Sequence, residues 1–198
     1  MITKVVAIVG SYRKGGTIDH AVEAVLMGAR EKGAVTQTIN LMDEQIEFCT
    51  NCRKCTQLPG EERGRCEQHD GLESALMSIE SASAVVLASP VNYYNVTALY
   101  RRFLERSIGY TYWPWGQNSP TLRNPKPRLK AVLVASSGMP GFLIPLVTGA
   151  AKALRLSAKM LGAKPVAKLW IGLAAGEPHH ALSNRTRERA RRIGSKLV

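Results

Sequence analysis

The chain has 198 residues, of which 45% are hydrophobic, and this is long enough for one well-filled core. No run approaches 18 uninterrupted apolar residues, which argues against a transmembrane helix and a membrane partner. No signal-peptide pattern precedes the first apolar run, so we expect a cytoplasmic protein.

The formal net charge is +12, and the last sixteen residues hold six basic residues against one acidic residue. This excess allows two interpretations. A basic C-terminal helix could bind nucleic acid, or it could be a solvated face whose charge attracts anionic cofactors and substrates. The arginine run lacks interleaved aromatic residues and matches no nucleic-acid-binding module, which favours the second interpretation.

Apolar, β-rich runs alternate with helical patterns along the chain. The first run, residues 5–9, is typical of a buried parallel strand, and Ile18, Val22, Val25 and Ala29 follow it with helical spacing. Asp70 is the expected N-cap of a later helix, and Ser183 the expected start of the last one. The other predicted strands span residues 35–41, 84–89, 129–136 and 165–171. The helix that Asp70 caps spans residues 70–81, and two further helices span 96–107 and 145–161.

Five strands that alternate with helices predict an α/β fold, with a parallel sheet covered by helices on both faces. We expect one domain over residues 1–198. Two segments interrupt the alternation: a cysteine-rich insertion at residues 46–69, and an excursion at 109–127 that is rich in proline, asparagine and aromatic residues.

The loop after the first strand has the composition of a phosphate site. Gly10, Ser11, Arg13, Gly16 and Thr17 lie where the strand gives way to a helix, so backbone N–H groups, hydroxyls and a positive charge face an anion. The glycine spacing matches neither the dinucleotide fingerprint nor a Walker A loop. A single mononucleotide phosphate fits better than either.

Two further loops meet the same edge of the predicted sheet. Residues 89–96 offer backbone amides, two tyrosines and two asparagines, and residues 136–141 offer small residues that allow close backbone approach. Such walls suit a heteroaromatic ligand, which needs hydrogen bonds at its edge and stacking on its faces.

Several motifs together resemble the NADPH-dependent FMN reductase family, in its iron–sulfur flavoprotein-like branch. They are Gly10-Ser-x-Arg-x-x-Gly-Thr17, the cysteine run from Cys49 to Cys55, Ser89-Pro-Val91, Asn95-Val-Thr97 and Arg102-Phe-Leu-Glu-Arg106. The resemblance implies a flavodoxin-like fold with strand order 2-1-3-4-5. It also implies one FMN per subunit, within a homodimer or homotetramer.

The resemblance further implies which residues bind FMN. The phosphate would lie against Ser11, Arg13, Gly16, Thr17 and Ile18. The isoalloxazine ring would meet Pro90, Val91, Asn92, Tyr93 and Asn95, with Ser137, Gly138 and Met139 on its third side. No catalytic acid or base is expected, because the flavin itself carries the redox chemistry.

All four cysteines, Cys49, Cys52, Cys55 and Cys66, fall within eighteen residues, with the spacing C-x₂-C-x₂-C-x₁₀-C. The first three spacings match a [4Fe–4S] ligand run, whereas a Cys₄ zinc site and a loop without metal are the alternatives. The neighbouring cations Arg53, Lys54 and Arg65 predict lowered thiol pKa values.

Two other features carry weaker signals. Residues 110–115 concentrate aromatic side chains, which indicates either a packed loop or interface, or a lid over the flavin. His179 and His180 end the turn-like sequence Gly176-Glu-Pro-His-His, and we see no third residue that would complete a metal site with them. We therefore expect both histidines at the surface.

The function implied by the resemblance is an oxidoreductase that passes electrons from NADH or NADPH through FMN to a quinone, a flavin or another small acceptor. The expected partners are the nicotinamide cofactor and a small-molecule or protein electron acceptor. The alternative is an iron–sulfur flavoprotein that transfers electrons through a [4Fe–4S] cluster. A nucleic-acid-binding protein that uses the basic C-terminal helix is the alternative from a different class.

Overall fold

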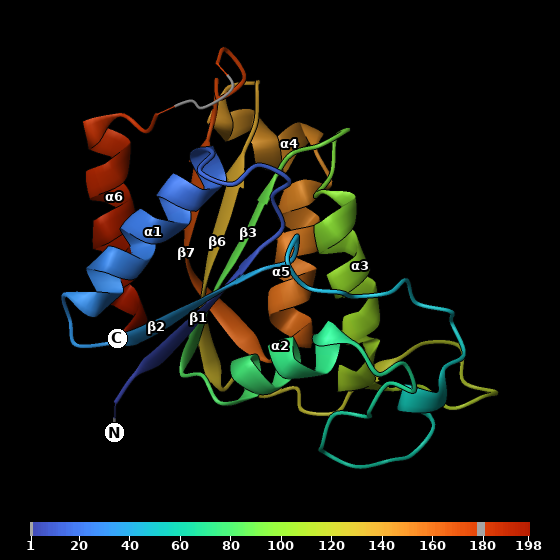
Figure 1. Cartoon of the computed structure of the whole chain (residues 1–198). Coiled ribbons are helices and arrows are strands. Elements are labelled where there is room, and N and C mark those ends of the chain that lie inside the picture. Colours follow the sequence, from blue (N-terminus) through green and yellow to red (C-terminus); the bar gives the residue numbers. More distant parts are fainter. Residues whose placement is uncertain (1, 178–180) are drawn as a thin grey trace.

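The computed structural model describes residues 2–177 and 181–198, so the expectation for His179 and His180 lies outside the described residues. Its centre is a five-stranded sheet in which all neighbouring strands are parallel, in the order β2-β1-β3-β6-β7 (Figure 1). The predicted order 2-1-3-4-5 is therefore confirmed. The strands are β1 (Lys4–Val9), β2 (Val35–Asn40), β3 (Ala84–Pro90), β6 (Leu129–Ser136) and β7 (Ala163–Ile171).

Helices cover both faces of this sheet (Figure 1). One face carries α1 (Thr17–Arg30) and α6 (Asn184–Gly194), and the other carries α2 (Gly71–Glu80), α3 (Ala98–Arg106) and α5 (Ala150–Met160). The predicted N-caps are confirmed, because Asp70 accepts a hydrogen bond from the Leu72 amide and Ser183 accepts one from the Thr186 amide. The described part of the chain also contains four short 3₁₀ helices: Lys54–Thr56, Ser107–Tyr110, Gly141–Leu143 and Ser195–Leu197.

The helix predicted over residues 145–161 is broken into α4 (Ile144–Val147) and α5. Thr148 adopts an extended conformation, and the Gly149 N–H donates to the Tyr94 carbonyl at 2.7 Å instead of continuing the helix. Within the described residues, no single helix has the length and apolar composition to cross a membrane. The segments Gly141–Val147 and Ala150–Met160 meet at a bend of 76°. Taken together they reach that length and apolar composition, and nothing else about them indicates a membrane span.

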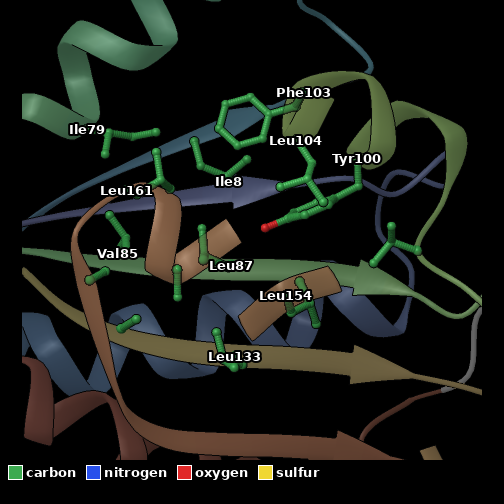
Figure 2. Close-up of a cluster of buried hydrophobic side chains, with 14 of the residues drawn as sticks. Ile8, Ile79, Val85, Leu87, Tyr100, Phe103, Leu104, Leu133, Leu154 and Leu161 are labelled. Atoms are coloured by element: carbon green, nitrogen blue, oxygen red, sulfur yellow. The ribbon is translucent and has the colours of Figure 1, made fainter. Parts of the chain in front are cut away.

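Two apolar layers form because side chains alternate across each strand. Figure 2 shows the layer under α2, α3 and α5, where Ile8, Leu87 and Leu133 of the strands face Tyr100, Phe103 and Leu154 of the helices. The opposite layer joins α1 and α6 to the other faces of β1, β3 and β6. Central strands buried on both sides explain the nearly continuous apolar runs of the sequence.

The two interrupting segments pack against each other beside the sheet (Figure 1). In the excursion, β4 (Thr111–Tyr112) pairs antiparallel with β5 (Thr121–Leu122). The backbone N–H of Trp113 donates to the Thr56 carbonyl, and the N–H of Gly64 donates to the Gly109 carbonyl. The cysteine-rich insertion thus obtains much of its order from a segment some fifty residues away in the chain.

Candidate functional site

A cavity of about 310 Å³ opens at the carboxyl edge of the sheet, where the loops after β1, β3 and β6 meet. Ligands of open α/β sheets bind at this edge. Ten of the thirteen residues predicted to bind the cofactor line the cavity: Ser11, Arg13, Gly16, Thr17, Ile18, Pro90, Val91, Asn92, Ser137 and Gly138. The other three, Tyr93, Asn95 and Met139, are not part of its lining.

The first loop presents the start of α1 to the cavity. Its N-cap residue is Gly16, which has no side chain to cap the first turn. Ser11 shapes the loop, since its Oγ accepts from the Arg13 amide at 3.2 Å and donates to the Arg13 carbonyl at 3.1 Å. The Gly15 amide is already taken by Asp19 Oδ2 at 2.6 Å. An anion at this site would therefore meet the Gly16–Ile18 side of the loop.

The first and second loops are joined by hydrogen bonds beneath the cavity. Thr97 Oγ1 donates to the Gly10 carbonyl at 2.6 Å, and the Thr97 amide donates to Ser89 Oγ at 3.1 Å. Only glycine fits at position 10, because the Cβ of any other residue would lie 2.6 Å from the Cβ of Tyr100. This buried network fixes the distance between the two walls.

The second loop ends in a tight turn with two tyrosines at its tip. Tyr93 and Tyr94 both have positive φ, of 45° and 62°, and the backbones of Asn92 and Asn95 bond to each other in both directions. This conformation normally favours Asn or Gly, and such strained positions concentrate at functional sites. The turn explains why Tyr93 is 96% exposed and does not line the cavity. The Asn95 side chain instead accepts from the Val96 amide.

The third wall comes from the ends of β6 and β7. The Ser137 hydroxyl donates to the Met139 carbonyl, and the Leu173 amide donates to the same oxygen, so the Met139 backbone is bound to the segment after β7. The lining also includes residues that sequence reasoning did not assign: Tyr12, Thr97, Ser136, Ala174 and Ala175. The two alanines follow the fifth parallel strand, whose carboxyl end belongs to the same edge, so topology could have identified them.

A second, smaller cavity of about 30 Å³ is lined by all four cysteines. Left-handed backbone at Asn51 and Arg53, with φ of 54° and 59°, bends the chain on both sides of Cys52. Burial, followed by the charges of Cys66, Cys52 and Cys49, raises the pKa of the Cys55 thiol to about 11. The lowered pKa predicted from neighbouring cations is thus wrong for Cys55, because burial and the clustering of thiols outweigh those cations.

Unpartnered polar atoms gather at the same cavity. Among the described residues, three buried side-chain atoms have no hydrogen-bond partner, namely Arg53 Nε, Gln68 Oε1 and Arg106 Nε, and all three residues line the cysteine cavity. Buried polar groups are normally paired, so these atoms are available to hydrogen-bond a group bound in the cavity. Two N–H donors beside four thiols suit an anionic, sulfur-rich group.

The four thiols do not form a compact group of three ligands. In residues 2–177 and 181–198, no three His, Cys, Asp or Glu side chains gather closely enough to hold one metal ion. A [4Fe–4S] cluster is larger, and its cysteine ligands bind different irons. Four thiols and two N–H donors around one cavity match the donor set of such a cluster.

The aromatic excursion lies over the cysteine segment and contributes no lining residue to the carboxyl-edge cavity. The guanidinium of Arg53 lies 3.9 Å from the ring centroid of Trp113 and 4.2 Å from that of Trp115. Arg53 Nη2 also donates to the carbonyls of Trp113 and Pro114. Of the two interpretations of this segment, the structure supports a packed loop rather than a lid over the first cavity.

The model of the NADPH-dependent FMN reductase family matches residues 3–142. An iron-sulfur flavoprotein of Archaeoglobus fulgidus is 33% identical over 111 residues, which cover 56% of this chain and 48% of that protein. One of Methanocaldococcus jannaschii is 31% identical over 104 residues, which cover 52% of this chain and 51% of that protein. The chain thus spans about half the length of these curated relatives.

Solved structures share the fold over the whole chain. An NAD(P)H:quinone oxidoreductase from Methanothermobacter marburgensis has a TM-score of 0.70 at 20% identity, with all of both chains covered. An azoreductase from Bacillus anthracis has a TM-score of 0.71 at 15% identity and covers 98% of this chain and 100% of its own. With a family model that matches well over half of its length, the chain belongs to the NADPH-dependent FMN reductase family.

Proposed function

We propose that the protein is an FMN-dependent oxidoreductase that takes electrons from NADH or NADPH and passes them to a small acceptor such as a quinone or a flavin. The carboxyl-edge cavity carries this proposal. It combines an uncapped helix start, an arginine and two amide-rich loops at the sheet edge where such ligands bind. Family membership supports the same cofactor.

Each wall has a defined task in this proposal. The first loop, with Ser11, Arg13 and Thr17, holds the phosphate through backbone N–H groups, hydroxyls and a guanidinium. The second and third loops hold the ring between Val91 and Gly138, where small or apolar side chains permit close contact. Bound FMN supplies the hydride and electron chemistry, and the protein anchors and orients it.

The phosphate site is tested by the affinity for FMN, measured from quenching of flavin fluorescence. Arg13→Ala removes a charge-assisted contact and should raise the Kd by about 10- to 100-fold. Lys14→Ala is the matched control, because Lys14 pairs with Asp43 at 2.5 Å and does not line the cavity. Equal affinities for the two variants, or no FMN binding by the wild type, would overturn the proposal.

We further propose that Cys49, Cys52, Cys55 and Cys66 hold a [4Fe–4S] cluster. The observation that favours this is the coincidence of four thiols and the unpartnered N–H donors of Arg53 and Arg106 around one cavity. A cluster would add one-electron transfer to the chemistry of the flavin. The names of the curated relatives support the same assignment.

The cluster is tested on protein reconstituted with iron and sulfide in the absence of oxygen. Wild type should bind about four irons per chain, whereas Cys66→Ser should lose most of the cluster and keep its FMN affinity. Thr50→Ser is the control, since Thr50 lines the same cavity and carries no thiol. Equal iron content in wild type and Cys66→Ser would exclude Cys66 as a ligand.

A further inference from the structure

Arg106, the last residue of α3, is a buried cation beside the cysteines. Its side chain is 1% exposed, and it pairs with Asp70, whose side chain is 9% exposed, at 2.7 Å. Burying an ion pair carries a large desolvation penalty and often adds little net stability. A role of Arg106 in the cysteine cavity would explain why the Arg106–Asp70 ion pair is buried at this position.

The guanidinium is held in one orientation by several acceptors. Its Nη1 donates to Asp70 Oδ2 at 2.7 Å and to the Glu47 carbonyl at 2.8 Å, and Nη2 donates to Asp70 Oδ1 at 3.2 Å. Asp70 is fixed in turn, since it accepts from the amides of Leu72 and Glu47. This double support leaves the guanidinium little freedom to turn away.

The same guanidinium contacts a cysteine sulfur. Nη2 lies 3.4 Å from Cys66 Sγ in a hydrogen bond, while Nε is buried without a partner and Arg106 lines the cavity. Two other nearby cations have different principal contacts. Arg53 stacks on two tryptophans, and Lys54 pairs with Glu67 at the surface.

We propose that Arg106, oriented by Asp70, positions Cys66 as a cluster ligand and raises the reduction potential of the cluster. The proposal rests on the proposed [4Fe–4S] site. A reduced cluster carries one more negative charge, so an N–H···S hydrogen bond from a guanidinium held in place stabilises it more than the oxidised cluster. Arg106 is thus a positioning residue that acts through Cys66.

Two variants separate this role from a structural one. Arg106→Lys keeps a positive charge beside Asp70. It loses the planar guanidinium, which hydrogen-bonds to the Asp70 carboxylate and the Cys66 sulfur at the same time. Asp70→Asn combined with Arg106→Gln removes both charges, leaves no buried ion unpaired and keeps an N-cap for α2. Arg101→Lys is the control, because Arg101 lies on the same helix, pairs with Glu105 and does not line the cysteine cavity.

The readouts are an EPR-monitored redox titration of the reconstituted cluster and resonance Raman spectra of its iron–thiolate stretches. Arg106→Lys and the double variant should both shift the potential to more negative values, because each loses the N–H···S hydrogen bond of the guanidinium, and both should alter the iron–thiolate bands. Arg101→Lys should match wild type in both measurements.

An intact cluster with unchanged potential and bands in both variants would overturn the role of Arg106 while the cluster site stands. A wild-type protein that binds no iron would instead overturn the cluster site, and the role of Arg106 with it. Near-ultraviolet circular dichroism and FMN affinity establish that each variant is folded.

Discussion

Asp70 shows how one side chain can join parts of the chain that are distant in sequence. It caps α2, receives the Glu47 amide and pairs with Arg106 at the end of α3. Burial alone would raise its pKa, but the hydrogen bonds from Arg106 and the amides of Glu47 and Leu72 outweigh burial, so the pKa lies below its ordinary value. The carboxylate is therefore expected to be ionised in the folded protein at neutral pH.

The lowered pKa of Asp70 predicts that the folded protein loses stability in acid. A depressed folded-state pKa stabilises the native state above the unfolded pKa of about 4, and the contribution is lost as pH falls through the folded pKa. Asp70→Asn should destabilise the protein by about 3 kcal/mol at pH 7, because Arg106 remains buried without its counter-charge. The difference from wild type should shrink below about pH 4, as measured by urea unfolding.

Glu67→Gln is the comparison for this measurement, since the Glu67 pair with Lys54 is exposed and should contribute little at any pH. A stability difference between Asp70→Asn and wild type that stays constant from pH 7 to pH 3 would contradict the assignment.

At the scale of elements, α1 and α6 pack with their backbones in direct contact. A Cβ on Gly28 would lie 1.9 Å from the Arg191 carbonyl oxygen, and a Cβ on Gly194 would lie 1.8 Å from that of Val25. Each helix thus presents a glycine to the other, at positions where alanine would normally favour a helix.

Gly28→Ala should therefore destabilise the protein by about 2 to 3 kcal/mol, as expected for overpacking, instead of stabilising it through helix propensity. Met27→Ala, at the neighbouring exposed position, should leave stability nearly unchanged. Thermal and urea unfolding of both variants measure the effect. A Gly28→Ala protein as stable as wild type would mean that the helices separate at little cost.

At the scale of the whole molecule, the cysteine-rich insertion and the aromatic excursion form one assembly beside the sheet. Arg123 holds it together, because its guanidinium donates to the carbonyls of Gly109, Leu58, Gly60 and Cys55. The carboxyl-edge cavity shares no lining residue with this assembly. Loosening the assembly is therefore expected to spare FMN binding.

Arg123→Met should expose residues 57–65 and 114–126 to limited proteolysis and reduce the iron retained after reconstitution, since four carbonyls each lose a hydrogen bond and, among the described residues, only that of Gly109 keeps another, from the Gly64 amide. FMN affinity should change by less than about twofold. Lys126→Met, an exposed change in the same segment, should digest like wild type. Resistance of Arg123→Met to proteolysis would show that the tryptophan–Arg53 contacts suffice.

The sequence by itself determined the parallel sheet and the loops that line most of the carboxyl-edge cavity, whereas the strand order followed from the resemblance to the FMN reductase family. Apolar runs buried on both faces, such as residues 84–89, and the strand-to-helix loop at Ser11–Thr17 depend on local chemistry that is visible in the residues. Their positions follow because parallel strands must place their carboxyl ends together.

Only the tertiary structure decided how the cysteine segment is held, where the tryptophans lie and which cation contacts a thiol. These arrangements join Arg53 to Trp113, Arg106 to Cys66 and Arg123 to Cys55, pairs that are 40 to 68 residues apart. No local periodicity encodes them, because they depend on side-chain geometry and burial that exist only after two irregular segments pack together. The same burial reversed the pKa shift expected for Cys55.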